Sequence, residues 1–239
     1  NVVSRPLGMA IDLATKFNIP VVTTLMGRGA FPDGHELCLE MPGMHGNYTA
    51  TTSIQKSDLL IAIGVRFDDR VTANPSFFAQ NAKVIHADID PAEIGKVREA
   101  QVPIVGDAKS VILGLIDALQ DEELDTKNWI NELNSMKTEH PLSYNQDENG
   151  PLKVPFVLEE LQDLTEEGAI VVSGVGQHQM WISQHWNFTE PNTWLNSGGL
   201  GTMGYSLPAA IGAKTAYPEK LVLALSLIHI SEPTRLATI

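Results

Sequence analysis

The chain has 239 residues, of which 43% are hydrophobic and 19% are charged, a balance typical of a globular protein. Lys and Arg number 16 against 29 Asp and Glu, and the formal net charge of −13 argues against a nucleic-acid-binding protein and against an anionic membrane partner. The longest clean apolar run, Leu59 to Val65, is too short to span a bilayer. A single cysteine, Cys38, excludes an internal disulfide framework and fits a reducing cytosol.

The first half of the chain predicts helices that alternate with short buried strands. Helical apolar spacing predicts helices over residues 6–17, 50–56 and 109–119. Short apolar runs predict strands over residues 21–25, 59–65, 84–89 and 104–105. This alternation, with strands that are apolar throughout, indicates a parallel sheet covered on both faces. We therefore expect an α/β, Rossmann-like domain over residues 1–122.

A polar segment, residues 123–151, follows this domain and is interpreted as a linker that contains one helix around Trp129 and Leu133. A second, truncated α/β domain is expected over residues 152–225. Its predicted helices cover residues 154–164, 177–184 and 207–217, and its predicted strands cover residues 169–173, 193–196 and 221–225. The last strand is expected to be buried in pattern but to lack partner strands. Residues 226–239 show no periodicity and form a tail.

Polar side chains follow the predicted strands of the first domain. The segment Arg66 to Arg70 follows one strand, Asp88 and Asp90 end the next, and Asp107 follows a third. Ligands of open α/β sheets bind at the carboxyl ends of strands, where an acidic group often binds the ribose of a nucleotide. For any single aspartate, a helix cap or a solvated loop is the favoured explanation. Three such groups after consecutive strands weaken that explanation but do not identify a ligand. No G-x-G-x-x-G segment follows a strand, so an ordinary NAD site is not supported.

Three glycine-rich segments allow backbone to approach a ligand closely: residues 42–46, 174–178 and 198–204. The second is a strand-to-helix turn, whose free N–H groups favour a phosphate. An ordinary tight connection explains the first segment equally well. His178 and His185 can share a helix face, but without a third ligand a zinc site is not expected. No Ser-His-Asp or Cys-His arrangement stands out.

Six stretches, in this order along the chain, resemble the large catalytic subunit of acetohydroxyacid synthase, also called acetolactate synthase. They are Thr24–Pro32, Pro42–Gly46, Gly64–Thr72, His86–Lys96, Gly174–Trp181 and Ser197–Gly204. The resemblance extends from residue 1 to about residue 225. It implies a thiamine-diphosphate-dependent enzyme, of which this chain contains the middle domain and the front part of the C-terminal domain.

The resemblance also implies which residues bind cofactors and substrate. A structural FAD without a net redox role would contact the middle domain at Thr24, Leu25, Pro42, Gly43, Met44, His45, Gly64, Val65, Arg66, Phe67, Asp68, Asp88, Ile89 and Asp107. Arg70 would recognise the carboxylate of the second 2-keto acid, because a guanidinium binds a carboxylate through two hydrogen bonds. In the C-terminal domain, thiamine diphosphate would contact Gln177 and His178 through its diphosphate and Gly201, Thr202 and Met203 through its aminopyrimidine.

Two parts of the family pattern are missing. The glutamate that activates the aminopyrimidine belongs to an amino-terminal domain, and the metal-binding Asp-Gly-Asp-Gly motif would follow Leu225, where this chain has Ser226 to His229. We expect the tail to be adaptor or vector read-through, or a frameshifted end. The chain is therefore expected to hold no catalytic residue and no metal ligand, and to be inactive alone.

The resemblance implies a parent enzyme that decarboxylates pyruvate and joins the two-carbon unit to pyruvate or 2-ketobutyrate, in the biosynthesis of valine, leucine and isoleucine. Its cofactors would be thiamine diphosphate, Mg²⁺ and FAD, and it would be a cytoplasmic homo-oligomer with a regulatory small subunit. Two alternatives are another FAD-carrying thiamine enzyme, such as a glyoxylate carboligase, and a non-catalytic nucleotide-binding module. The segment Arg66 to Arg70 favours the synthase over the carboligase.

Overall fold

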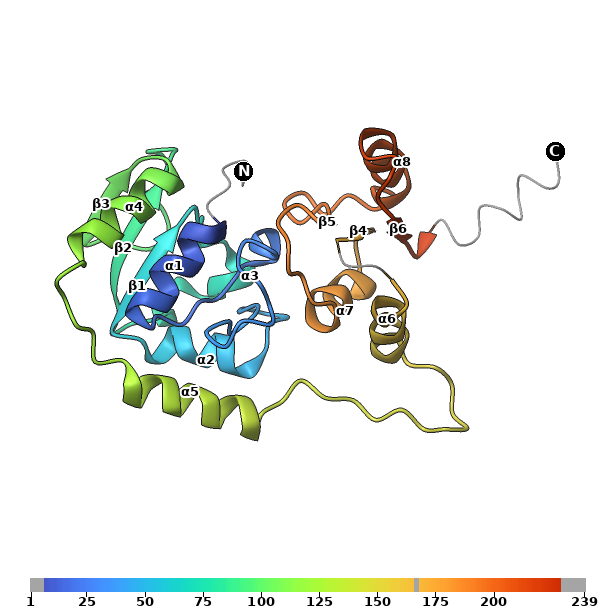
Figure 1. Cartoon of the computed structure of the whole chain (residues 1–239), viewed down its shortest axis with the longest axis horizontal. Coiled ribbons are helices and arrows are strands. Elements are labelled where there is room, and N and C mark those ends of the chain that lie inside the picture. Colours follow the sequence, from blue (N-terminus) through green and yellow to red (C-terminus); the bar gives the residue numbers. More distant parts are fainter. Residues whose placement is uncertain (1–6, 166–167, 229–239) are drawn as a thin grey trace. The chain divides into compact units, whose positions relative to one another are not determined.

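The computed structural model describes residues 7–165 and 168–228, which form two compact units (Figure 1). Unit 1 contains the described parts of residues 1–31 and 35–141, and unit 2 contains residues 32–34 and the described part of 142–239. The expected first residue of the first helix, Pro6, and most of the expected tail lie outside the described residues. In the part of the chain that the structure describes, no helix has the length and apolar character needed to cross a membrane.

Unit 1 is built on a parallel sheet whose strand order is β1-β2-β3, with β1 at Leu59–Ile63, β2 at Lys83–Asp88 and β3 at Val102–Val105. Ile63 lies opposite Ala87, and Asp88 lies opposite Val105. The carboxyl ends of all three strands therefore meet at one edge. This confirms the parallel α/β sheet expected from the apolar runs.

The strand expected over residues 21–25 is wrong. Val21 forms only an isolated parallel bridge with Cys38, and Leu25–Gly27 form a 3₁₀ helix, η1. The backbone is extended before η1, but its hydrogen bonds go to a loop: the N–H groups of Val21 and Thr23 donate to Leu37 and Glu40. A β-branched run is thus not enough to form a strand when its partner segment is irregular.

The helices of unit 1 cover both faces of the sheet. They are α1 (Leu7–Phe17), α2 (Tyr48–Lys56), α3 (Asp69–Thr72), α4 (Ala108–Ala118) and α5 (Lys127–Glu139), with a second 3₁₀ helix, η2, at Pro75–Phe77. Leu13 of α1 and Ile112 of α4 pack in one cluster with Ile63 of β1. Ile54 of α2 packs in another cluster with Ala62. Because neighbouring strand residues point to opposite faces, these clusters lie on the two sides of β1.

Helix α5 belongs to unit 1 although it lies within the expected linker. Its Leu133 and Met136 are buried in a cluster with Leu39 and Ala50 of the same unit. Two surface contacts accompany this packing: Lys56 pairs with Glu132 at 2.7 Å, and Tyr48 stacks at a tilt on His140. We therefore propose that the linker proper starts after α5 rather than at residue 123.

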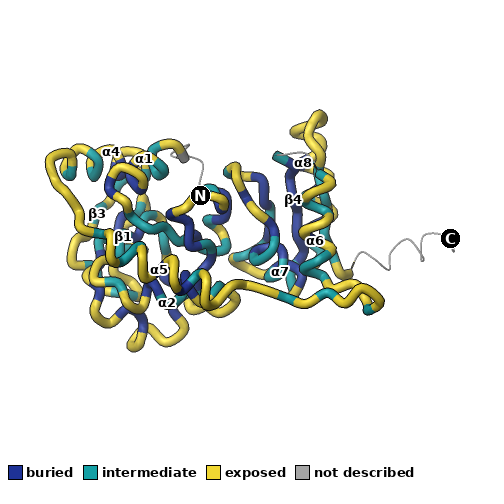
Figure 2. Tube along the Cα trace, turned by 60° about the horizontal axis from the view of Figure 1, so that its bottom comes forward, coloured by how far each residue is buried: buried dark blue, intermediate teal, exposed yellow. Residues whose placement is uncertain are grey.

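Unit 2 is built on a second parallel sheet, with β4 (Ile170–Ser173) between β5 (Trp194–Leu195) and β6 (Val222–Leu225). Its helices are α6 (Val154–Asp163), α7 (Gln177–His185) and α8 (Ser206–Ala216). All four residues of β4 are buried, and the trace in Figure 2 is dark blue along this strand. The expectation that the last strand lacks partners is wrong, because β6 pairs with β4 from Val222 to Leu225. The expectation that this strand is buried is also wrong, because Ala224 is exposed, as is usual for an edge strand.

Candidate functional site

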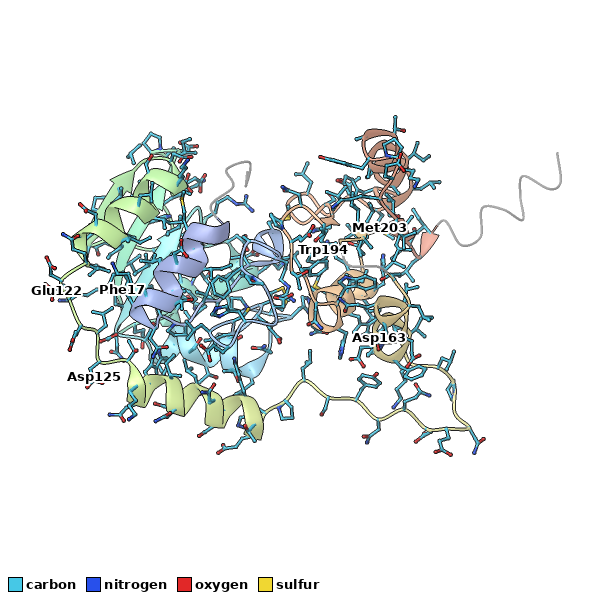
Figure 3. All side chains as sticks on the ribbon, in the orientation of Figure 1. Phe17, Glu122, Asp125, Asp163, Trp194 and Met203 are labelled. Atoms are coloured by element: carbon cyan, nitrogen blue, oxygen red, sulfur yellow. The ribbon has the colours of Figure 1, made fainter. Side chains whose placement is uncertain are left out.

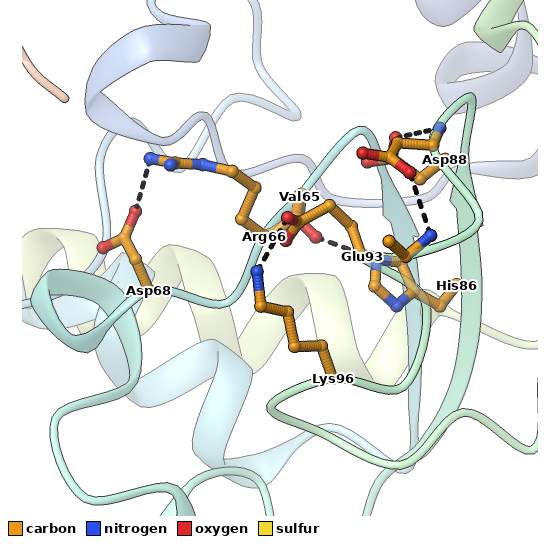
Figure 4. Close-up of polar contacts among 9 residues, drawn as sticks. Val65, Arg66, Asp68, His86, Asp88, Glu93 and Lys96 are labelled. Carbon is orange, nitrogen blue, oxygen red and sulfur yellow. Dashed lines mark hydrogen bonds and ion pairs between the residues drawn. The ribbon is translucent and has the colours of Figure 1, made fainter.

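The loops at the carboxyl edge of the unit 1 sheet are hydrogen-bonded to the end of β2. The Gly64 N–H donates to the Ala87 carbonyl (2.8 Å), and the Gly106 N–H donates to the Asp88 carbonyl (3.0 Å). These bonds bring together three groups of residues that the resemblance assigns to FAD: Gly64 to Asp68, Asp88 with Ile89, and Asp107. Figure 4 labels Val65, Arg66 and Asp68 of the first group and Asp88 of the second, together with His86.

The loop after β1 is shaped by its own side chains. Asp68 caps α3, since its Oδ1 accepts from the Arg70 N–H at 3.1 Å, and its Oδ2 lies 3.4 Å from Nη2 of Arg66. Phe67 adopts a positive φ of 54° and is 4% exposed, with its ring edge against Phe78. This conformation turns one residue of the loop into the core and leaves Arg66 exposed at the surface.

The glycine loop Pro42 to His45 is held against α3 through backbone contacts. The Met44 N–H donates to the Arg70 carbonyl at 2.8 Å. Gly43 has a φ of +102°, and a Cβ there would lie 2.4 Å from the same carbonyl oxygen, so only glycine fits. The structure thus places a second group of predicted FAD residues next to the first. Thr24 and Leu25 lie at η1, shortly after Val22, which packs against the same buried cluster as Val65 and Val71.

Two of the aspartates predicted at the strand ends, Asp88 and Asp107, already have structural partners. Oδ1 of Asp88 accepts from the Asp90 N–H at 2.9 Å. Oδ1 of Asp107 caps α4 by accepting from the N–H groups of Lys109 and Ser110. One oxygen of each carboxylate therefore stabilises a turn or a helix start, as the alternative interpretation of these aspartates expected.

Arg70 lies on α3 with 69% of its side chain exposed, and its Nη1 pairs with Oδ2 of Asp69 at 3.1 Å. An ion pair this exposed contributes little free energy, so the guanidinium can exchange it for another carboxylate at low cost. This geometry is compatible with the role that the resemblance assigns to Arg70.

In unit 2, a glycine turn joins β4 to α7 at the carboxyl edge of the sheet. The Gly174 N–H donates to the Leu225 carbonyl at 2.8 Å, and Gly176 has a φ of +149°. A Cβ on Gly174 would lie 2.9 Å from Nε2 of His178. The imidazole therefore packs closely against this turn, and a side chain at position 174 would make the ring shift. Helix α7 begins next to that ring at Gln177.

The His178 ring is buried, and neither of its nitrogens has a hydrogen-bond partner among the described residues. Burial lowers the pKa of His178, so the ring is neutral at pH 7 and can still donate one hydrogen bond. An unpaired buried nitrogen costs free energy until a ligand satisfies it. Together with the amino end of α7, the ring forms a donor set that suits a phosphate group.

The second glycine segment of unit 2 lies beside this turn. A Cβ on Gly201 would lie 3.8 Å from a methyl carbon of Val175, and the Thr202 N–H donates to Oγ of Ser197 at 3.0 Å. Met203 is 59% exposed in the loop ahead of α8, where Figure 3 labels it. The structure thus brings Gln177 and His178 together with Gly201, Thr202 and Met203 at one edge.

The described residues contain no cluster of ligating side chains for a metal ion. Among residues 7–165 and 168–228, no group of three or more His, Cys, Asp or Glu side chains could hold a metal. Apolar side chains follow β6 instead: Cδ1 of Leu227 lies 3.5 Å from a Cβ built on Gly176, and Cδ1 of Ile228 lies 3.4 Å from one built on Gly204. His229 lies outside the described residues.

Two features of the structure were not identified from the sequence. His86, on β2, contacts both loops around the predicted FAD residues. Its signal in the sequence is one polar ring between the apolar residues Val84, Ile85 and Ala87. A cavity of about 120 Å³ also lies at the opposite, amino end of β4, lined among others by Gln162, Ala169 and Asn187. It includes none of the predicted site residues.

Comparison with known proteins supports the motif-based resemblance. Residues 7–115 match the family model "Thiamine pyrophosphate enzyme, central domain", and residues 174–226 match "Thiamine pyrophosphate enzyme, C-terminal TPP binding domain". Acetolactate synthase of Mycobacterium leprae is 54% identical over 218 residues, which are 90% of this chain and 35% of that protein. The acetolactate synthase large subunit of Corynebacterium glutamicum is 52% identical over 87% of this chain and 34% of its own length.

A plant protein, the chloroplastic acetolactate synthase of Arabidopsis thaliana, is 45% identical over 92% of this chain and 33% of its own length. The chain therefore spans about a third of the length of these curated relatives.

Proposed function

The chain belongs to the thiamine pyrophosphate enzymes, and we propose that it is part of the large catalytic subunit of an acetolactate synthase. The whole protein would decarboxylate pyruvate and join the two-carbon unit to a second 2-keto acid, pyruvate or 2-ketobutyrate. The observation that carries the proposal is the unpaired, buried His178 ring beside a glycine turn and a helix start. Relatives 52–54% identical to the chain are named acetolactate synthase.

Thiamine diphosphate is the cofactor we assign to unit 2. When bound, it supplies a carbanion nucleophile and an electron sink. Gln177 and His178 would bind its diphosphate, because the amino end of α7 and a neutral imidazole both donate hydrogen bonds to anions. Gly201, Thr202 and Met203 would contact the aminopyrimidine, with the exposed Met203 side chain bending the cofactor. For the whole protein we place the Mg²⁺ ligands outside the described residues, 7–165 and 168–228, since no group of three or more ligating side chains lies among these.

FAD is the cofactor we assign to unit 1, in a structural role. The fit rests on two features of the sheet edge. A Cβ on Gly64, whose φ is +66°, would meet no atom within 4 Å, which leaves space directly after β1. Met44 and Ile89 expose 60% and 71% of their apolar side chains at the two loops. A flat ring system that covers these groups would remove apolar surface from water. Arg70 would recognise the carboxylate of the second keto acid.

The remaining proposals concern assembly and compartment. The name of the Corynebacterium glutamicum relative, a large subunit, supports a regulatory small subunit as partner of the whole protein, and we propose a homo-oligomer. The single cysteine supports a reducing compartment, and we propose the cytoplasm; the Arabidopsis relative is named chloroplastic. The alternative enzyme function is that of a glyoxylate carboligase. The alternative outside catalysis is a nucleotide-binding module.

A chimera tests the proposed function. Residues 7–225 replace the matching segment in the large subunit of Corynebacterium glutamicum acetolactate synthase, which supplies the rest of the protein. We expect acetolactate from pyruvate at a rate within about tenfold of the unmodified subunit, because about half of the exchanged residues are identical. A chimera that folds and converts only glyoxylate would establish the carboligase, and one that folds and converts neither acid would support the non-catalytic module.

A further inference from the structure

His86 is a polar side chain buried among apolar strand residues. It lies on β2 and is 0% exposed. Its Nε2 lies 2.8 Å from the Val65 carbonyl oxygen, in the loop after β1 (Figure 4). Its Nδ1 accepts from the Gly95 N–H at 3.4 Å, in the turn after β2. The edge of its ring packs against Phe67, with the ring centroids 5.0 Å apart.

A single neutral tautomer of His86 satisfies both contacts. The proton on Nε2 is donated to Val65, and the lone pair on Nδ1 accepts from Gly95. Both bonds are part-buried. The His86 ring itself is 0% exposed, so leaving its two nitrogens without these partners is costly. The ring therefore ties the loop after β1 to the turn after β2.

These two segments carry the predicted FAD residues. Val65 leads directly into Arg66, Phe67 and Asp68. Gly95, with a φ of +73°, ends the turn that starts at Asp88 and Ile89. The backbone bond from Gly64 to Ala87 joins the same two segments at the end of the strands, whereas the His86 ring joins them further along each loop.

We propose that His86 is a positioning residue of the flavin site: through its two ring nitrogens it fixes the spacing of the two loops that bind the cofactor. This inference rests on the proposed FAD site. The ring itself is fully buried and does not touch the ligand, so it acts only through the loops.

Three variants of the whole chain separate the two bonds. His86→Phe keeps a ring and loses both bonds. His86→Gln keeps a donor at the position of Nε2, and His86→Asn keeps an acceptor at the position of Nδ1. Val84→Ala is the matched control, because Val84 is equally buried two residues earlier on the same face of β2.

Hydrogen exchange and flavin fluorescence are the two measurements. We expect His86→Phe to speed amide exchange in both loops and to weaken FAD binding about tenfold, because two hydrogen bonds are lost. His86→Asn should loosen residues 65–68 and spare Gly95, and His86→Gln should do the reverse. Val84→Ala should change FAD affinity less than about twofold.

The outcomes test the role of His86 separately from the proposed FAD binding. If the unmodified chain does not bind FAD, the flavin proposal fails, and the exchange pattern alone still decides whether His86 ties the loops. If Asn and Gln loosen both loops to the same degree as Val84→Ala does, His86 is an ordinary core residue and the inference is overturned.

Discussion

Both sheets are parallel and three-stranded, but their carboxyl edges differ in how the polar groups are satisfied. In unit 1, the carboxylates of Asp88 and Asp107 cap turns, and the buried His86 ring has a partner at each nitrogen. In unit 2, the buried His178 ring has no partner at either nitrogen among residues 7–165 and 168–228. The edge of unit 1 is thus stabilised by its own residues, whereas the edge of unit 2 holds donors that a ligand would satisfy.

Glycine replacements probe the rigidity of the two edges and give the largest expected effect. Gly43→Ala should destabilise unit 1 by at least about 3 kcal/mol, because it adds a clash with the Arg70 backbone to an unfavourable positive φ. Gly174→Ala should cost unit 2 only about 1–2 kcal/mol, because the nearest atom belongs to the His178 ring, which can shift. Urea titration followed by hydrogen exchange of each unit measures both values.

The control is Gly8→Ala in α1, where a Cβ meets no atom within 4 Å. It should stabilise unit 1 by about 0.5–1 kcal/mol, because alanine favours a helix over glycine. Equal costs for Gly43→Ala and Gly174→Ala would contradict the contrast between a backbone clash and a movable ring.

The same substitution at the two buried histidines should have opposite signs. His86→Leu should destabilise unit 1 by about 2 kcal/mol, because a carbonyl and an N–H group lose their partner. His178→Leu should stabilise unit 2 by about 1 kcal/mol, because it removes two unpaired nitrogens from the interior. Unit-resolved hydrogen exchange in urea measures both. A loss of stability at position 178 would show that the ring has a partner after all.

The pH dependence of unit 2 gives a smaller effect. Burial lowers the pKa of His178 in the folded state. Just below pH 6.5, the ring is therefore protonated in the unfolded chain but remains neutral in the folded protein. The His178 contribution is therefore constant above this pH and destabilises unit 2 as the pH falls below it. We expect the stability difference between His178→Leu and the unmodified chain to grow from pH 7.5 to pH 5. A difference that does not change over this range would mean that the ring protonates equally in both states.

The smallest expected effect concerns the segment that leads into α6. The Tyr144 hydroxyl donates to Glu159, and this hydrogen bond raises the pKa of Tyr144 to about 12. Glu159→Gln should return the Tyr144 pKa toward 10, since the amide no longer disfavours the phenolate. Absorbance titration at alkaline pH measures it, with Tyr144→Phe to identify the signal among the four tyrosines. An unchanged titration curve would remove Glu159 as the cause.

Much of the fold could be predicted because its elements carry periodic patterns. The apolar runs of β1, β2 and β4 and the spaced apolar residues of α1 and α4 are local signals, and their types were predicted correctly. The structure of residues 21–25 was predicted wrongly, because a strand there depends on a partner segment elsewhere in the chain, and Val21 forms only an isolated bridge with Cys38. The later linker start that we propose rests on a similar point: Leu133 of α5 is apolar in a polar stretch, and only the fold shows that it is buried with Leu39.

The candidate site divides in the same way. Motifs identified the segments that reach each sheet edge, since carboxyl ends of parallel strands converge. They could not show that one oxygen of Asp107 caps α4 or that the His178 nitrogens lack partners, because both facts are properties of packing. His86 was overlooked because one polar residue in an apolar strand carries no indication of what lies on either side.

The contact between the glycine loop and α3 has a consequence for how this protein can evolve. The bond from Met44 to position 70 ends on a backbone carbonyl, and the close approach of Gly43 meets the same atom. Neither contact involves the side chain at position 70. Substitutions at position 70 can change the charge and shape of the exposed side chain without breaking the contacts that hold the glycine loop. The side chain at this edge can therefore change independently of the loop position.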